Sequence, residues 1–365
     1  MRQQDLLAAG LILILVWMPL PFGSNQPMYW VYGEVALQAL TLVVLVMLSL
    51  GSLGISGAFR GARLPLSIFL FFVVSQLTLH HWPGVQWSAD QSATNAQLIK
   101  SICLFEVFCL TLLLITNEQR FKWLVVTLLI AGTFQAIYGT LMTVTGTDYI
   151  WDYQKVENKG LATGTFVNRN HLAGYLEMTL ALGLGLMIAN LGEGRSRTWR
   201  QFFRSWAQTL LGPKVRIRGC LILMVIGLIL TRSRMGNTAF FVGMGIAGMI
   251  GLFVFRKSQT GVVALFVSIL VIDILLLGTF FGIEELQQRF EQVSVEDARV
   301  SIISLSLGLV QMAPWLGHGL GTFYAVFPQV RNHEVFAFFD HTHSDLVEFP
   351  LEVGVVGTLP LVALF

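Results

Sequence analysis

Residues 341–357 read HTHSDLVEFPLEVGVVG and place two histidines and three carboxylates at the start of an apolar run. Charged side chains that enter a membrane-like segment are costly, so other groups must stabilise them. The stretch therefore predicts two features together: a helix in a membrane, and a polar site where that helix begins.

The composition of the whole chain supports a membrane location. Of its 365 residues, 55% are hydrophobic and only 12% are charged, and the mean hydropathy is +0.69. A soluble protein of this length carries about twice that charged fraction. Apolar runs of about 20 residues, the length that an α-helix needs to cross a hydrocarbon core, recur along the sequence. We predict an all-α polytopic membrane protein with the lipid bilayer, and no nucleic acid, as a partner.

The apolar runs predict a helical bundle of about ten spans in one transmembrane domain, 1–365. The spans are 6–22, 33–53, 64–80, 94–116, 121–145, 171–191, 217–232, 237–255, 260–282 and 345–365. The first lacks a small-residue cleavage site and is followed by further spans, so we interpret it as a span and not as a cleaved signal. The last ends at Phe365 with no polar flank. We therefore expect the chain to be cut short there.

The basic residues predict the orientation of the spans. Most of the 23 lysines and arginines fall in short loops on one side of the predicted membrane, and short cytoplasmic loops are enriched in these residues. We therefore place the N-terminus in the cytoplasm. One inner loop carries TWRQFFRSWAQTLL at 198–211, which alternates arginines with aromatic rings. It predicts an interfacial helix on the inner leaflet.

The residues suited to binding or catalysis lie mainly on the predicted outer side. All seven histidines lie at or beyond it in this topology. A large, partly helical periplasmic loop at 283–344 is the longest outer segment, and long loops of distinct composition are often functional. An aromatic interface belt is the alternative explanation for its many rings. Six arginines also lie outward: Arg169, Arg232, Arg234, Arg289, Arg299 and Arg331.

These outward arginines favour an anionic ligand. A guanidinium presents a planar fork of donors that matches phosphate oxygens two at a time. The sharpest case is LTRSRMGNT at 230–238, where Arg232 and Arg234 lie in a tight turn between two spans. Any single arginine is explained as well by lipid headgroups or by nearby acids such as Glu284. The whole set indicates a ligand at the outer membrane surface.

The opening stretch predicts a site at a helix start. Thr342 precedes Asp345 by three residues, as in a capping box, which would begin the helix near His343. Eleven residues of helix end about 20° past three full turns, so we expect His343 and Gly354 on one face. The carboxylates of Asp345, Glu348 and Glu352 then fall on the opposite face. An imidazole at this position suits a general base or a hydrogen-bond donor, and a structural helix cap is the alternative.

The stretch GTFVNRNHLAGYLEM, at 164–178, repeats this design. Asn168 or Asn170 can cap a helix, and helix N-termini attract anions. Arg169 adds positive charge at the same place. We therefore expect a second polar site at the start of this helix.

The third stretch, 296–323, combines a helix with a glycine-rich turn. An apolar helix stripe is predicted from Val300, Ile303, Leu307 and Val310. Gly317, Gly319 and Gly321 follow Pro314. We expect a turn there whose backbone amides meet a ligand.

Together these stretches resemble the O-antigen ligase and polymerase family of bacterial inner-membrane glycosyltransferases. The elements that carry the resemblance are GTFVNRNHLAGYL, the outward arginine of SRM, and the pair formed by residues 298–323 and the opening stretch. The family's motif of a histidine, ten residues and a glycine matches His343 through Gly354. Its motif of an arginine, three residues and a leucine is approximated by Arg299 through Ile303, where isoleucine replaces leucine.

The resemblance implies a GT-C-type enzyme that moves a glycan from a polyprenyl-diphosphate donor to a hydroxyl, without a metal or other cofactor. It implies that Arg234 and Arg299 hold the donor diphosphate and that His343 assists the accepting hydroxyl. Further outward residues are candidates for substrate binding: Arg169, Asn170, His171, Arg232, His318, Arg331 and His341. The acceptor is another glycan, a lipid core or a protein at the periplasmic face of the inner membrane.

Two other classes of protein remain alternatives. His341 and His343 with Asp340 or Asp345 could bind zinc in a membrane hydrolase, although the outward arginines would repel a cation. Ionisable residues within spans, such as Lys100, are also typical of transporters. The resemblance leaves open whether the enzyme is a ligase, which passes the glycan to another molecule, or a polymerase, which extends it.

Overall fold

The computed structural model describes residues 3–80, 88–189, 213–254, 300–332, 335 and 338–364. These residues are mainly helical, with one two-stranded hairpin. The all-α fold class predicted from the apolar runs is confirmed. The chain divides into two compact units, one made of Met1–Ala36 and Asn117–Gly282 and the other of Leu37–Thr116 and Ile283–Phe365.

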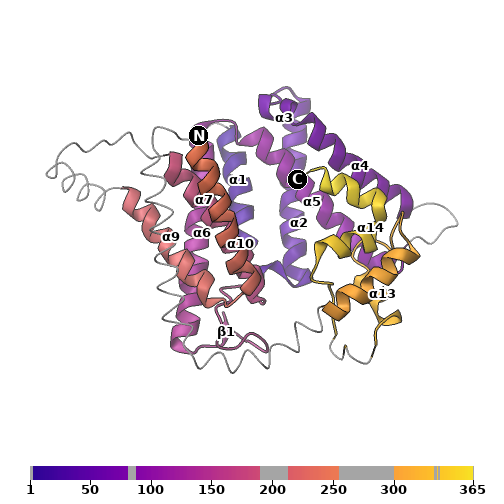
Figure 1. Ribbon diagram of the computed structural model, residues 1–365. Coiled ribbons are helices and arrows are strands. Elements are labelled where there is room, and N and C mark those ends of the chain that lie inside the picture. Colours follow the sequence, from indigo (N-terminus) through magenta and orange to yellow (C-terminus); the bar gives the residue numbers. More distant parts are fainter. Residues whose placement is uncertain are drawn as a thin grey trace. The chain divides into compact units, whose positions relative to one another are not determined.

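The first unit is a bundle of helices around α6 (Figure 1). Its elements are α1 (Gln3–Trp17), the 3₁₀ turn η1 (Phe22–Ser24), α6 (Glu118–Thr145), β1 (Tyr149–Ile150), β2 (Tyr153–Gln154), α7 (Arg169–Ala189), α9 (Pro213–Leu230) and α10 (Arg234–Val254). Contacts join α6 to α1, α7 and α9. Leucine, valine, methionine and alanine side chains from α6, α7 and α9 fill the core between them.

The bounds of α6 follow from its sequence. The Asn117 side chain accepts a hydrogen bond from the Arg120 amide and caps the first turn. Gly146, at φ 66°, ends the helix in the left-handed conformation that glycine adopts readily. The side chain of Arg120 is only 4% exposed and lies 2.9 Å from the Asp5 carboxylate. This ion pair joins α1 to α6, so a predicted inner-loop arginine has a structural role.

The second unit packs helices against the described residues between 300 and 340, which belong to the segment that the sequence predicts to lie outside the membrane and are called the outer segment below. Its elements are α3 (Gly57–Gly61), α4 (Arg63–His80), α5 (Gln91–Leu114), a helix at Val300–Met312, α13 (Phe323–Val326), the 3₁₀ turn η2 (Phe327–Gln329) and α14 (Asp345–Val362). Helix α2 (Pro27–Ser49) runs from the first unit into this one. Figure 1 shows α14 in yellow, and contacts join it to α4. A core that includes Ile302, Phe323, Val335 and Leu351 joins the outer segment to α14.

Three helices of the described chain, α2, α5 and α6, are long and apolar enough to cross a membrane. Four shorter apolar helices accompany them: Gln3–Trp17, Arg63–Thr78, Met235–Ile250 and Val300–Met312. These findings support a membrane protein, whereas the count of about ten spans stays a prediction. The predicted span at 260–282, the interfacial helix at 198–211 and the first part of the 283–344 loop lie outside the described residues.

The predicted apolar stripe lies on the helix Val300–Met312, but it is not the face that is buried. Val300 and Leu307 are exposed, whereas Ile302, Ser306 and Leu309 are fully buried. This helix is apolar on more than one face, so periodicity could not choose the face that packs. Contact with α13 and Leu351 made the choice.

Candidate functional site

The loop at 341–344 is folded around the carboxylate of Glu348, one turn into α14. Nδ1 of His341 lies 2.5 Å from Oε1 of Glu348. The backbone N–H of Thr342 donates to Oε2 at 2.8 Å, and the Thr342 hydroxyl lies 3.0 Å from the same oxygen. Thr342 is completely buried. The carboxylate of Glu348 therefore fixes the segment that leads to His343.

His343 lies outside the helix, in an unusual backbone conformation. Its φ angle is 60°, in the left-handed region that few residues other than glycine occupy. The residue is exposed, and its ring meets that of Phe339 edge-on, with ring centroids 6.0 Å apart. Because α14 begins only at Asp345, the prediction that His343 shares a helix face with Gly354 is wrong.

The predicted capping box is also wrong in its acid. Ser344 is the N-cap of α14, and its side chain makes no capping hydrogen bond. Asp345 is exposed. The acid that reaches back to Thr342 is Glu348, three residues further along. Spacing alone could not distinguish the two carboxylates, since the extended backbone at Ser344 (φ −147°, ψ 104°) decides where helical geometry begins.

Gly354 breaks α14 within the predicted span. Its φ of 60° and ψ of −171° are not helical, and this combination is essentially restricted to glycine. The amides beyond the break, Val355 and Val356, donate to the carbonyl oxygens of Pro314 and Trp315 at 2.9 and 3.1 Å. The break therefore joins α14 to the glycine-rich turn, and the freed backbone groups are satisfied, as a membrane environment requires.

Backbone amides of the glycine-rich turn also donate hydrogen bonds to α14. His318 donates to the carbonyl oxygen of Leu351 at 2.9 Å, and Gly319 donates to that of Glu352 at 2.8 Å. A side chain at Gly317, whose φ is 70°, would overlap the backbone of Glu352. Turn and broken helix are thus interlocked at close backbone approach.

The carboxylate of Glu352 completes this interlock. It is 5% exposed and accepts the amides of Gly321 at 2.8 Å and Phe323 at 3.1 Å. The prediction that amides of the glycine-rich turn meet a ligand is therefore wrong for Gly319 and Gly321. The free amides of a turn attract any anion, and here a side chain of the same chain supplies it.

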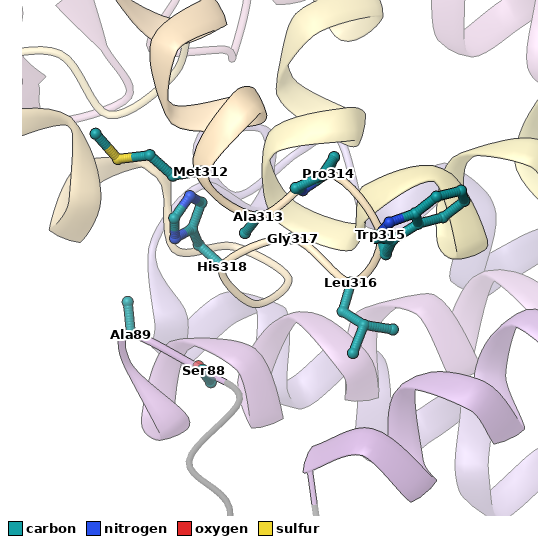
Figure 2. Close-up of a pocket in the computed structure, with 9 residues that line it drawn as sticks. All are labelled: Ser88, Ala89, Met312, Ala313, Pro314, Trp315, Leu316, Gly317 and His318. Atoms are coloured by element: carbon teal, nitrogen blue, oxygen red, sulfur yellow. The ribbon is translucent and has the colours of Figure 1, made fainter.

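A pocket of about 650 Å³ adjoins this turn. Figure 2 shows its lining: Ser88, Ala89, Met312, Ala313, Pro314, Trp315, Leu316, Gly317 and His318. Nε2 of His318 lies 2.9 Å from the Leu309 carbonyl oxygen, and the His318 carbonyl accepts the Ala89 amide at 2.8 Å. His318 thus reaches a cavity, as substrate binding requires, while one ring nitrogen serves the fold.

Of the two arginines of the second unit that were predicted to bind substrate, the structure describes Arg331 and not Arg299. Arg331 is exposed, and its Nε donates to the Val335 carbonyl oxygen at 2.5 Å. This bond closes the segment that follows η2. Arg299, predicted to hold the donor diphosphate, lies outside the described residues, as do Arg289 and His333.

The first unit carries the polar helix start predicted at 164–178. Asn168 caps α7, since its side-chain oxygen accepts the Asn170 amide at 2.8 Å. Arg169 is half-buried, whereas Asn170 and His171 are exposed. The preceding loop is anchored by Gln135 of α6, which bonds both the amide and the hydroxyl of Thr165. The prediction of a capped helix start with exposed polar groups is confirmed.

The tight turn between α9 and α10 is also confirmed. Arg232 has a left-handed backbone (φ 53°) and an exposed side chain, and Arg234 is the first residue of α10. Ser233 is buried and its hydroxyl caps the Gly236 amide at 3.2 Å. The side chain of Arg234 lies outside the described part of the chain. A joint grip on one ligand by Arg234, Arg299 and His343 stays a prediction.

A comparison with protein families gives a match in the C-terminal part of the chain. Residues 219–362 match the family model described as O-antigen ligase. The match covers 144 of the 365 residues, so the chain is similar to the O-antigen ligase family over this segment. The matched segment contains the arginine turn (230–238), the glycine-rich turn (314–321), the histidine loop (341–344) and the broken helix α14. The resemblance predicted from the sequence is confirmed, and the searches of curated proteins and of solved structures gave no match.

The sequence left a zinc site at His341 and His343 as an alternative. Within the described ranges, no group of three histidine, cysteine or acidic side chains is placed to hold a metal ion. Nδ1 of His341, the proposed first ligand of such a site, pairs with Glu348. The sequence predicted no specific role for Glu348 or Glu352. Their positions nevertheless indicated one, because acids one helical turn apart in an apolar run require partners.

The pairing of His341 with Glu348 predicts a pH-dependent loop. The hydrogen bond to Glu348, with the nearby charges of Asp340 and Glu352, raises the pKa of His341 above its ordinary value, and partial burial opposes this. A raised pKa in the folded state stabilises the loop below the unfolded pKa, and this contribution is lost as pH rises through the folded pKa. We expect amides 341–344 to be better protected from hydrogen exchange at pH 6 than at pH 8.5, after correction for intrinsic rates. His341→Gln should lose this difference, and an unchanged difference in that variant would contradict the pairing.

Proposed function

We propose that this protein is a glycosyltransferase of the O-antigen ligase or polymerase type. It moves a glycan from a polyprenyl-diphosphate donor to an acceptor hydroxyl. The observation that carries the proposal is the histidine loop, which is folded around Glu348 within the segment that matches the family. An exposed imidazole on a fixed loop at a helix start is suited to meet a substrate hydroxyl.

The reaction assigns roles to three residues. The acceptor hydroxyl loses its proton to His343 while its oxygen bonds to the anomeric carbon of the donor sugar. The bond from that carbon to the phosphate oxygen breaks, and the electron pair leaves with the polyprenyl diphosphate. Arg234 and Arg299 hold this diphosphate and stabilise the charge that grows on it, an effect that is strong in a water-poor site. No metal is needed in this scheme.

The remaining candidates extend the substrate site. Exposed groups at the start of α7 and in the arginine turn suit the anionic donor: Arg169, Asn170, His171 and Arg232. His318, Arg331 and His341 belong to the outer segment and α14 and suit the glycan or the acceptor, which is a second glycan, a lipid core or a protein. In this proposal the chain is a GT-C-like bundle of about ten spans in the bacterial inner membrane. Its N-terminus is cytoplasmic and its site is periplasmic.

The decisive experiment incubates the purified protein with a polyprenyl-diphosphate oligosaccharide and sizes the products. A ladder of lengths identifies a polymerase, and one new product that requires an added lipid-core or protein acceptor identifies a ligase. Activity should survive a chelator, whereas loss restored by zinc would favour the hydrolase. Flux of the lipid-linked substrate in proteoliposomes without any glycan product would favour a transporter and contradict the proposal.

A further inference from the structure

Three carboxylates lie in the first part of α14, and their surroundings differ. Asp345 is exposed in the first turn. Glu352 holds the glycine-rich turn through the amides of Gly321 and Phe323. Glu348 makes the hydrogen bonds to the histidine loop. Its side chain is 14% exposed, against 63% for its partner His341, so the acid forms the inner support and the ring lies on the outside.

The bonds around His343 leave its backbone little freedom. On one side, Thr342 is held to Glu348 through both its amide and its hydroxyl. On the other side, the Ser344 amide donates to the Thr342 hydroxyl at 3.1 Å, and the Ser344 carbonyl accepts the Glu348 amide at 2.9 Å. His343 thus forms the apex of a loop that closes on one residue. A left-handed histidine persists only where its surroundings determine its conformation, and such residues concentrate at functional sites.

We propose that Glu348 is a positioning residue that holds His343 in its left-handed conformation for the acceptor hydroxyl, with His341 as a second support of the same carboxylate. The inference rests on the proposed function and adds to it the residue that fixes the geometry of the base. Glu348 has no proton-transfer role in this account. Its effect on the reaction passes through His343.

The first test is Glu348→Gln. The amide has one oxygen and one NH₂ group, so either the Thr342 amide faces a donor or His341 must adopt the tautomer whose Nδ1 accepts, and the negative charge that supports the loop is lost in both cases. Loss of orientation should lower kcat by about 10- to 100-fold with little change in KM for the donor, since misplacement of a catalytic group by about 1 Å has effects of this size. Glu348→Asp retains both acceptor oxygens and should recover part of kcat. Asp345→Asn, the same charge change at an exposed position of the same helix, is the matched control.

The second test separates positioning from a general structural effect. In a double-mutant cycle, Glu348→Gln should lower kcat in the wild-type background and have almost no further effect in the His343→Ala background. Thermal unfolding of each purified variant is measured in parallel. Thr342→Val, which keeps the amide and removes the hydroxyl, should give a smaller loss of kcat with the same dependence on His343.

The outcomes are distinct. Equal loss from Glu348→Gln in both backgrounds overturns the inference, because Glu348 would then act independently of His343. Full activity of Glu348→Gln overturns it as well. Loss of activity that merely follows a lower unfolding temperature, with no recovery in Glu348→Asp, assigns Glu348 to the fold and rejects the positioning role. The absence of glycan transfer by the wild-type protein would instead reject the proposed function itself.

Discussion

Replacement of His343 by alanine is expected to lower glycan transfer by about 10²- to 10⁴-fold, the range that general acid–base catalysis contributes. The amount of protein inserted in the membrane should stay the same, because the His343 side chain is exposed and lies outside α14. Arg234→Ala should abolish transfer for a different reason, since charge on the leaving diphosphate then lacks its partner. The measurement is surface-glycan assembly in a knockout complemented by each variant, with product formation by the purified protein.

A second variant at the same position removes the main ambiguity. Alanine in a left-handed conformation is strained, so His343→Ala could disturb the loop as well as remove the ring. His343→Asn avoids this, because asparagine tolerates the left-handed region but has no basic nitrogen. It should be as inactive as the alanine variant. Asp340→Ala, at an exposed position beside the loop, should keep normal transfer, and normal glycan assembly with either His343 variant would contradict the assignment.

Gly354→Ala is expected to cause the largest loss of stability. The backbone at Gly354 has φ 60° and ψ −171°, a combination that costs other residues about 1–3 kcal/mol. A Cβ atom would also lie 2.3 Å from the carbonyl carbon and oxygen of Trp315, and overpacking of this kind costs about 1–3 kcal/mol more. Because the neighbour is backbone, it cannot rotate away. We expect a loss of at least about 3 kcal/mol and separation of α14 from the glycine-rich turn.

Thermal unfolding of the purified protein, followed by tryptophan fluorescence, measures this effect. The matched control is Gly308→Ala in the helix Val300–Met312 of the same unit, where no atom lies within 4 Å of the added Cβ. Alanine at that helical position should be neutral or slightly stabilising. An unchanged unfolding temperature for Gly354→Ala would show that the interlock contributes nothing to stability.

The sequence predicted the elements well where one physical requirement dominates. Apolar runs must be helical in lipid, because every backbone group needs an internal partner. Helices α2, α5, α6 and α7 therefore lie close to the spans predicted for them. Capping was equally local: the sequence predicted Asn168 or Asn170 as the cap before α7, and the structure shows that it is Asn168. Predictions that depend on which neighbour a helix packs against were less accurate. The apolar stripe from Val300 to Val310, for example, is not the buried face of its helix.

The predictions for the candidate site show the same contrast between local requirements and the choice of a neighbour. The motif from His343 to Gly354 indicated the family whose model matches residues 219–362, yet the geometric reason offered for it, a shared helix face, was wrong. The two residues serve different purposes: His343 is the apex of a loop, and Gly354 allows a backbone contact with Trp315. Spacing records that both are needed and does not reveal how each is used.

The sequence by itself determined that this chain is a helical membrane protein, similar to the O-antigen ligase family over residues 219–362, with histidine and arginine gathered in few segments. Those properties follow from composition and short motifs, which act locally along the chain. Only the tertiary structure decided which acid holds the histidine loop and which acid holds the glycine-rich turn. Glu348 and Glu352 have the same chemistry, one helical turn apart. Their roles differ because backbone amides more than 20 residues away in sequence, at Gly321 and Phe323, reach one carboxylate and not the other.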